Sequence, residues 1–489
     1  MAISPMLRGL RSGFGKLAVV SGFALILVLL ALPTFALPGD QPVTVDPAVA
    51  APAVAADPQP GSLSKAPKPL GPAWMNQDTL LNWGPARQNW ADKGFSFDFH
   101  YITDALGDVR HPVGTDETFV NWQRIRGTVD VDFGKFSSAK GLAFHATGVW
   151  QNGTNMGGVI GSIANPSGIV SSHQFRLDSI WLSQAFMQNK VQVTAGIMAA
   201  QDFYGICCDA AYLAEPMFYN YGNMGNTRTS YDPQSAPAVN LKVVPNKHVF
   251  VQTGYFLPSD DGEEHDYPTG FNYKSGHHGA TSDTAIGYFT DPDAPATRKS
   301  YPGVYQAGYI YNGSKAGSGP GPTGYSGFFD YKAMKYVDGN YLFYVQGSQP
   351  VYRVKPGSNR GLDVWAGLNT GPENKSEIPT EFIMGLVFHG PFGSTGNRAK
   401  DSIAAGVTYS KFGSDYKTAC RTNPDTLASM GVGCNAITAM SDERQYEFNY
   451  LAQVFPFLYI QPVVQYYANV GGRNNGSATV AGFRLVAHF

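Results

Sequence analysis

The sequence RQYEFNYLAQVFPFLYIQPVVQYYANVGGRNNGSATVAGFRLVAHF, residues 444–489, decides the fold. It holds three segments in which apolar and polar side chains alternate, separated by Phe455-Pro456 and by a Gly-Gly-Arg-Asn-Asn-Gly turn. Alternation with a period of two predicts β-strands with one apolar and one polar face. The pattern fits a soluble sandwich, whose apolar faces form a core, and equally a membrane barrel, whose apolar face meets lipid.

The N-terminal residues predict export from the cytoplasm. Three basic residues precede an apolar run over residues 17–32, and Thr34-Phe35-Ala36 places small residues where a cleavage site needs them. This arrangement is typical of a secretory signal peptide, which we expect over residues 1–36. The competing interpretation is a membrane anchor, for which the run is somewhat short. We expect no helical membrane span elsewhere, because no other segment has about twenty consecutive apolar residues.

The composition agrees with an exported β protein. Hydrophobic residues make up 43% of the chain and aromatic residues 13%, mainly 27 Tyr and 30 Phe, with 56 Gly. The formal net charge of −2 becomes more negative once the basic signal peptide is removed, which excludes a basic nucleic-acid binder. A large secreted β protein would share this composition, so the strands themselves must decide the class.

Two segments without strand pattern precede the β-rich part. Residues 37–75 are rich in Pro and Ala and cannot bury a core, so we expect a disordered periplasmic linker. Residues 76–93 predict a short amphipathic periplasmic helix, broken near Gly84-Pro85. Residues 94–489 then form the strand-rich domain.

The polar faces of the strands favour a membrane barrel. A packed soluble sandwich would not carry Arg124, Arg126, Asp130 and Asp132 on one face of a strand, opposite a fully apolar face, and repeat such a pattern along so many strands. In a porin the polar face lines water and the apolar face meets lipid. We therefore predict an all-β fold, a transmembrane antiparallel β-barrel of about 16 strands.

The connections divide into turns and loops. Pairs of the Asn-Gly or Asp-Gly type at residues 152, 312, 338 and 475 predict tight hairpin turns. Long stretches rich in Gly, Pro and Asp are the expected extracellular loops, and some of them are expected to fold inward and narrow the pore. These stretches are residues 153–173, 205–237, 258–302 and 413–444.

Four cysteines raise the question of disulfides, which an exported protein permits. Four cysteines allow three connectivities, of which we favour Cys420–Cys434, closing one outer loop. Cys207 and Cys208 are then reduced, paired with each other or cross-linked elsewhere. No metal site is expected from the cysteines, because no Cys-x-x-Cys pair is present. For the stretch that holds His265, His277 and His278 we favour a solvated loop over the alternative of a divalent-metal site.

A series of motifs carries a family resemblance. It consists of Trp83-Gly84-Pro85-Ala86-Arg87, Asp130-Val131-Asp132-Phe133, Gly141-Leu142-Ala143-Phe144-His145, Trp181-Leu182-Ser183-Gln184, Gly385-Leu386-Val387-Phe388-His389-Gly390-Pro391-Phe392, Tyr446-Glu447-Phe448-Asn449-Tyr450, Leu458-Tyr459-Ile460-Gln461-Pro462 and Gly482-Phe483-Arg484. In this order and spacing the chain resembles the OprB-type carbohydrate-selective porins of Gram-negative bacteria, from about residue 81 to residue 489. The resemblance implies an outer-membrane barrel that passes glucose-like sugars or polyols by diffusion. It also implies that the barrel-assembly machinery reads the terminal Phe489.

The polar face supplies a candidate sugar pathway. Sugars are neutral and rich in hydroxyl groups, so selecting them requires fixed hydrogen-bond donors and acceptors and aromatic faces. The lumen-facing candidates are Arg124, Arg126, Asp130, Asp132, Glu447, Asn449, Tyr459, Gln461, Gln465 and Arg484. For each of them the alternative is that charges pair across the lumen and only stiffen the wall. Counting back in twos from Phe489 places Phe483 and Leu485 on the lipid side.

The sequence therefore predicts a passive porin that is not an enzyme and needs no cofactor or metal. Its expected partners are small sugars and outer-membrane lipid, and no nucleic acid. The sequence is compatible with both a monomer and a homotrimer. A structural or adhesive barrel with a plugged lumen is the alternative, followed by an outer-membrane barrel hydrolase. No HExxH or GxSxG motif supports the hydrolase, and residues 317–324 lack the strand and helix of a phosphate-binding loop.

The first prediction concerns processing. We expect the mature chain to begin near Leu37 and to fractionate with outer membranes, because residues 1–36 have the three parts of a signal peptide. Mass spectrometry of the purified protein measures its first residue. Recovery of the chain with residues 1–36 intact in a soluble fraction would contradict this expectation.

Overall fold

The computed structural model describes residues 85–110, 119–163, 165–170, 174–204, 213–214, 226–231, 235–258, 279–290, 303–316, 327–355, 358, 360–393, 397–430, 434, 441–474 and 476–489. Several sequence predictions lie outside these residues. They are the signal peptide, the linker, the first half of the expected helix, the pair Cys207 and Cys208, the three loop histidines and the glycine-rich stretch at 317–324.

Sixteen strands of the described chain close into one barrel. They are β1 (Phe95–Arg110), β2 (Phe119–Asp132), β3 (Leu142–Gly153), β4 (Gln174–Phe186), β5 (Val191–Met198), β6 (Ala236–Asn246), β7 (Val249–Phe256), β8 (Thr281–Phe289), β9 (Val304–Asn312), β12 (Asn340–Arg353), β13 (Gly361–Thr370), β14 (Thr380–His389), β15 (Ser402–Lys411), β16 (Glu443–Phe455), β17 (Leu458–Ala468) and β18 (Ser477–His488). Sequential strands pair in antiparallel fashion, β9 pairs with β12, and β1 pairs with β18 to close the ring. The predicted antiparallel barrel is confirmed.

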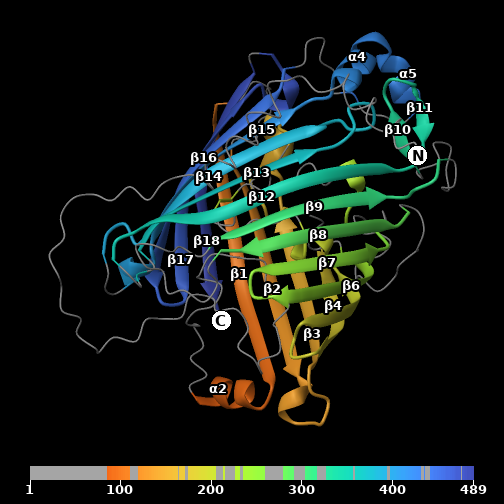
Figure 1. Ribbon diagram of the computed structural model, residues 1–489. Helices are drawn as coiled ribbons and strands as arrows, with labels where there is room; N and C mark the ends of the chain where they lie inside the picture. Colours follow the sequence, from red (N-terminus) through yellow and green to blue (C-terminus); the bar gives the residue numbers. More distant parts are fainter. Residues whose placement is uncertain are drawn as a thin grey trace, which may run out of the picture. The chain divides into compact units, whose positions relative to one another are not determined.

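Short elements lie between and before the strands. The helices are α2 (Pro85–Asp92), α3 (Met156–Ile160), α4 (Ser414–Thr422) and α5 (Pro424–Ser429). The 3-10 turns are η3 (Phe133–Lys135), η4 (Ala200–Asp202), η9 (Asn397–Lys400) and η10 (Val470–Gly472). A small hairpin joins β10 (Phe328–Asp330) to β11 (Lys335–Val337). Figure 1 places α2 at one end of the barrel, and α4, α5 and the hairpin at the other. No helix among the described residues has the length and hydropathy to cross a membrane.

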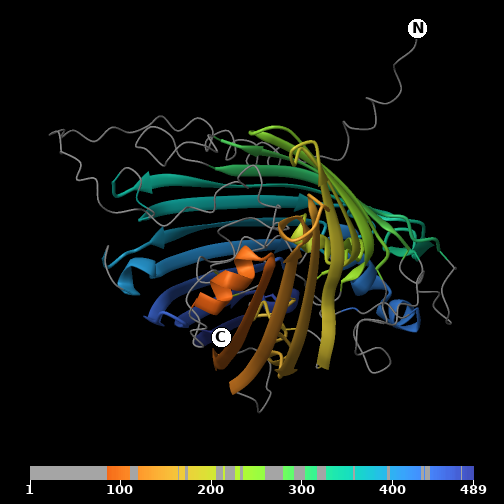
Figure 2. The ribbon, with the colours of Figure 1, turned by 90° about the horizontal axis from the view of Figure 1, so that it is seen from below.

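The lengths of the connections give the barrel its orientation. At the end that carries α2, toward which Figure 2 looks, residues 187–190, 247–248 and 456–457 join their strands by short turns. The other end carries the longest connections, among them residues 154–173 and 412–442, whereas the longest at the α2 end is residues 290–303. Outer-membrane barrels have short periplasmic turns and long extracellular loops, so the α2 end faces the periplasm.

The two faces of the sheet differ as the alternation predicts. On β16, Phe448 is 55% exposed, whereas Glu447 is 3% exposed. Phe483 and Arg484 on β18 repeat this contrast, with the aromatic ring outward and the guanidinium buried inside. The outward face is apolar where lipid surrounds it, and the inward face carries the polar groups.

Two predictions about the connections are wrong. The stretch 258–302 is not one loop, because it contains β8. Its outward residues include Ser282 and Thr284, so the strand lacks the apolar alternation that marks its neighbours. The second wrong prediction is that of tight hairpin turns at residues 152, 312 and 338. The Asn-Gly pairs at 152 and 312 end β3 and β9 at the extracellular side, where long connections begin. Asp338-Gly339 joins β11 to β12, which do not pair with each other.

The contrast between the faces yields a prediction at the middle of β16. Phe448→Lys places a charge on the outward face and should lower the free energy of unfolding by about 2–4 kcal/mol. Phe448→Leu keeps the face apolar and should cost less than about 1.5 kcal/mol. Urea unfolding of protein refolded into lipid vesicles measures both. Equal stability of the two variants would place Phe448 away from lipid.

Candidate functional site

Two connections fold inward and pack against the inner face of the barrel. The β3–β4 segment is residues 154–163 and 165–170, and the β5–β6 segment is residues 199–204, 213–214, 226–231 and 235. From the β3–β4 segment, the α3 residues Met156 and Ile160 pack on Tyr467 and other inward side chains of β1, β2, β17 and β18. These segments narrow the interior, in line with the expectation that some long connections fold inward.

The start of the β5–β6 segment rests on a different part of the wall. Phe203 and Tyr204 pack with Phe256 of β7 and Tyr344 of β12 in a buried cluster. The hydroxyl of Tyr204 donates a hydrogen bond of 2.6 Å to Oδ1 of Asn240. Apolar packing and a buried hydrogen bond together fix this part of the segment against the wall.

A buried ion pair anchors both inner segments at the seam between β1 and β18. Arg484 donates from Nε to Oδ1 of Asp104 at 2.7 Å and from Nη2 to Oδ2 at 2.8 Å. The hydroxyl of Ser167 in the β3–β4 segment donates to the same carboxylate at 2.5 Å. Nη2 of Arg484 also reaches the carbonyl oxygen of Ala214 in the β5–β6 segment at 3.3 Å. The bidentate geometry and the added hydrogen bonds offset the cost of burying two charges.

Glu447 of β16 forms the second half of this anchor. Its Oε1 accepts from the backbone N–H of Ala214 and from Nδ2 of Asn449, both at 2.7 Å. Its Oε2 accepts from Nε2 of Gln465 at 3.0 Å, and the same amide donates to the carbonyl of Pro166 at 2.8 Å. Four of the predicted residues, Glu447, Asn449, Gln465 and Arg484, therefore meet in one network that holds the inner segments.

A second set of polar side chains lies on the wall formed by β2, β3 and β4. Arg126 pairs with Asp178 at 3.0 Å, and Nδ1 of His145 lies 2.7 Å from Oδ1 of Asp130. The ring of His145 stacks on Trp181 with 4.6 Å between centroids. The side chains of Arg126, Asp130 and His145 keep partial exposure, so they offer polar atoms to the interior.

A third set, which the sequence did not indicate, lies on β12, β13 and β14. Arg353 donates to both carboxylate oxygens of Asp363, from Nη2 at 3.1 Å, and His389 approaches the same carboxylate at 3.2 Å. In the order of the ring, β13 lies eight strands from β3 in either direction, so the two sets occupy opposite walls. Each set combines cationic and anionic groups. Those of the third set lie near the periplasmic ends of their strands, whereas Arg126 and Asp178 lie closer to the middle of β2 and β4.

The other predicted residues have different surroundings. Arg124 and Gln461 are buried on the inner face, and Tyr459 belongs to a buried cluster with Ile169 and Leu213 of the two inner segments. Asp132 lies at the periplasmic turn, where Oδ1 accepts a hydrogen bond of 2.9 Å from the N–H of Gly134. Asp132 is therefore a turn cap and stands apart from the other candidates.

The extracellular end carries a small cluster closed by a disulfide. Cys420 of α4 is bonded to Cys434, with 5.5 Å between their Cα atoms. Phe329 of the β10–β11 hairpin and Tyr416 of α4 pack beside Cys420. Burial raises the pKa of the nearby Glu377 carboxyl, although its hydrogen bond with Tyr416 opposes the shift. The disulfide and this packing give the extracellular surface a compact unit.

The closed barrel, its apolar outer face and its polar interior narrowed by inward segments define a diffusion porin of the outer membrane. The chain belongs to the carbohydrate-selective porin, OprB family, whose model matches residues 116–489. It is an outer-membrane porin for the passive, selective diffusion of small carbohydrates.

Individual relatives agree with this family. The chain is similar to Porin B of Pseudomonas aeruginosa, with 26% identity over 458 residues that cover 88% of this chain and 94% of the relative. The fold is similar to the high-pH structure of Pseudomonas putida OprB, with a TM-score of 0.73, 20% identity, and coverage of 85% and 100% of the two chains. The low-pH structure of that protein gives a TM-score of 0.50 with 16% identity, covering 86% and 99%.

The extracellular cluster supplies a prediction about oxidation. We expect Cys420 and Cys434 to be disulfide-bonded in the mature protein and accessible from outside the cell. In the chain-entropy model, closing a loop of this size stabilises the fold by about 3 kcal/mol. Non-reducing peptide mapping measures the bond directly, and recovery of both thiols free would contradict it.

Proposed function

We propose that sugars pass between the two charged walls, β2–β4 and β12–β14, which face each other across the barrel. The observation that carries this proposal is the pairing on each wall, Arg126 with Asp178 and Arg353 with Asp363, on opposite sides of the ring. Paired charges present fixed donors and acceptors with little net field. A neutral molecule with many hydroxyl groups gains hydrogen bonds there, while a small ion gains little attraction.

Several wall side chains are more exposed than those of the anchor, although Asp178 is buried as deeply as the anchor residues. Asp104, Glu447 and Arg484 are buried and already use their polar atoms to hold the inner segments. Asp130 and His389 keep more of their side-chain surface exposed. We therefore assign contact with sugar to the two charged walls. The anchor residues control the pore width through the inner segments that they hold; they are Glu447, Asn449, Gln465 and Arg484.

The remaining expectations extend this proposal. Residues 1–36 direct export and are removed, residues 37–75 form a periplasmic linker, and the barrel-assembly machinery reads Phe489. Passage needs no chemical step, so we assign no catalytic residue. Lipid surrounds the apolar face, and the assembly is a monomer or a homotrimer.

Arg353→Gln tests the sugar pathway. The variant removes one bidentate donor from the β12–β14 wall, so the apparent affinity for a permeating sugar should fall about 2- to 10-fold, the equivalent of one hydrogen bond. Sugar-induced interruption of the ion current through single channels in planar bilayers measures this affinity, and heat-modifiable migration in gels checks assembly. Lys315→Gln is the matched control, because Lys315 pairs with Asp338 on an exposed extracellular connection.

Glu447→Gln separates the anchor from the walls. It weakens the hold on Ala214 and should raise the conductance of assembled channels while sugar affinity changes less than in Arg353→Gln. Unchanged sugar affinity in Arg353→Gln would defeat the assignment of the walls. A wild-type protein that neither conducts ions nor swells sugar-loaded liposomes would instead support the plugged structural barrel.

A further inference from the structure

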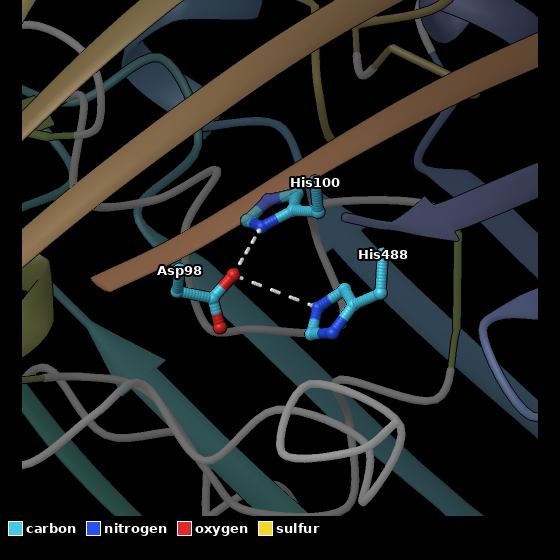
Figure 3. A group of neighbouring side chains, drawn as sticks. All are labelled: Asp98, His100 and His488. Atoms are coloured by element: carbon cyan, nitrogen blue, oxygen red, sulfur yellow. Dashed lines mark hydrogen bonds and ion pairs between the residues drawn. The ribbon is translucent and has the colours of Figure 1, made fainter. Parts of the chain in front are cut away.

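Three side chains of metal-ligand type meet at the periplasmic end of the barrel seam. Asp98 and His100 lie on β1, and His488 lies on β18. The strand register pairs His100 directly with His488, and Asp98 points to the same face because it lies two residues away on β1. Figure 3 shows one carboxylate oxygen of Asp98 facing a nitrogen atom of each imidazole ring.

The distances within this Asp98–His100–His488 cluster suit one small cation. Oδ1 of Asp98 lies 3.5 Å from Nδ1 of His100 and 3.7 Å from Nε2 of His488. One ligand atom from each residue lies within 4.8 Å of the other two. In a tetrahedral zinc site with bonds of about 2.0–2.1 Å, neighbouring ligand atoms are about 3.3–3.5 Å apart. The two separations from Asp98 are therefore close to the required value, and that between the two imidazole nitrogens is at most 4.8 Å.

The backbone holds the ligands in place from both sides. The N–H of His488 donates to the carbonyl of Phe457 on the neighbouring turn at 2.9 Å. The N–H of Phe489 donates to the carbonyl of Phe99 at 2.9 Å, between the two β1 ligands. The rings of His100 and His488 lie 5.8 Å apart and nearly parallel. The frame that carries the donors is thus set by the barrel itself, which reduces the ordering cost of binding.

Exposure and charge also favour an ion at this position. The side chains of Asp98 and His100 are 19% and 13% exposed, so water from the lumen reaches the cluster and fills the remaining positions on a metal. Arg126 is the register partner of His100 on β2. Its positive charge is balanced by Asp178 at 3.0 Å, which lowers the repulsion that a cation would meet.

We propose that Asp98, His100 and His488 form a binding site for one divalent transition-metal ion, of the Zn²⁺ or Cu²⁺ class. Two imidazole nitrogens and one carboxylate oxygen, with positions open to water, are a donor set that such ions accept. The bound ion cross-links β1 to β18 where the barrel closes, and adds positive charge to the periplasmic mouth of the pore. Sequence alone does not indicate the site, because its ligands come from the first and last strands.

Calorimetry with Zn²⁺ tests the site in the untagged, full-length porin after treatment with a chelator. The wild type should bind one more Zn²⁺ per chain than His488→Gln, or bind it at least tenfold more tightly. His248→Gln is the matched control, because His248 lies at the β6–β7 turn and contacts the carbonyl of Phe289 instead. Equal Zn²⁺ binding by the wild type and His488→Gln would overturn the proposal, as would equal losses in both variants.

Electron paramagnetic resonance of Cu²⁺ bound to the unmodified protein gives a test that does not depend on a variant that assembles. The proposal requires nitrogen hyperfine splitting from two imidazoles at one equivalent of Cu²⁺. A spectrum without nitrogen splitting would overturn it. In assembled His100→Gln the splitting should fall to that of one imidazole, and a spectrum unchanged by this substitution would place the ion elsewhere.

Discussion

Closure of the sheet between β1 and β18 is the constraint on which the rest of the structure depends. Within lipid, backbone N–H and C=O groups must find partners inside the protein, and a closed ring of strands leaves no edge. The seam joins the first strand of the barrel to the last, so the whole domain must be present before it closes. The pair Asp104–Arg484 lies directly across this seam, and its ion pair adds a side-chain link to the backbone ladder.

The same seam determines how the interior is filled. Asp104 also accepts from Ser167, and Arg484 also donates to Ala214, so closing the ring creates the positions to which both inner segments bind. Removing either Asp104 or Arg484 would leave the other charge buried without its counter-charge. In proteins this lowers the free energy of unfolding by about 3–5 kcal/mol. The contacts of both inner segments at the seam therefore depend on ring closure, whereas the start of the β5–β6 segment is fixed separately by Tyr204 on β6 and β7.

The alternation of apolar and polar side chains along a strand was enough to predict the strands and their two faces. It was not enough to predict the turns or the contacts between distant strands. Alternation in β16 and β18 correctly separated Phe448 and Phe483 from the polar face, because lipid and water impose opposite polarities. The hairpin turns predicted at residues 152, 312 and 338 are not hairpin turns, and the pattern did not indicate the tight β4–β5 turn, where Met187, Gln188 and Asn189 adopt positive φ without any glycine. Here the pairing of the flanking strands overrides local preference.

The candidate site was predictable only in part, for a related reason. Alternation finds an inward residue such as Arg484, but it does not say which residue faces it across the ring. Asp104, Asp363 and His389 were missed because their partners depend on strand register and on inner segments that no local pattern specifies. Inward polar residues show the same alternation in the sequence whether they hold the inner segments or line the lumen. Only the assembled barrel distinguishes the two roles.

The inward residues of β1 separate two roles along a single strand. Asp98 and Asp104 are six residues apart, about 20 Å along an extended strand, so the histidine cluster and the anchor occupy different levels of the lumen. Sites so far apart contribute to stability almost independently. A cation at the periplasmic level therefore changes the charge of the mouth without loosening the inner segments. On the two proposals, the width and the charge of the pore depend on different residues of the same strand, Asp104 for the width and Asp98 and His100 for the charge.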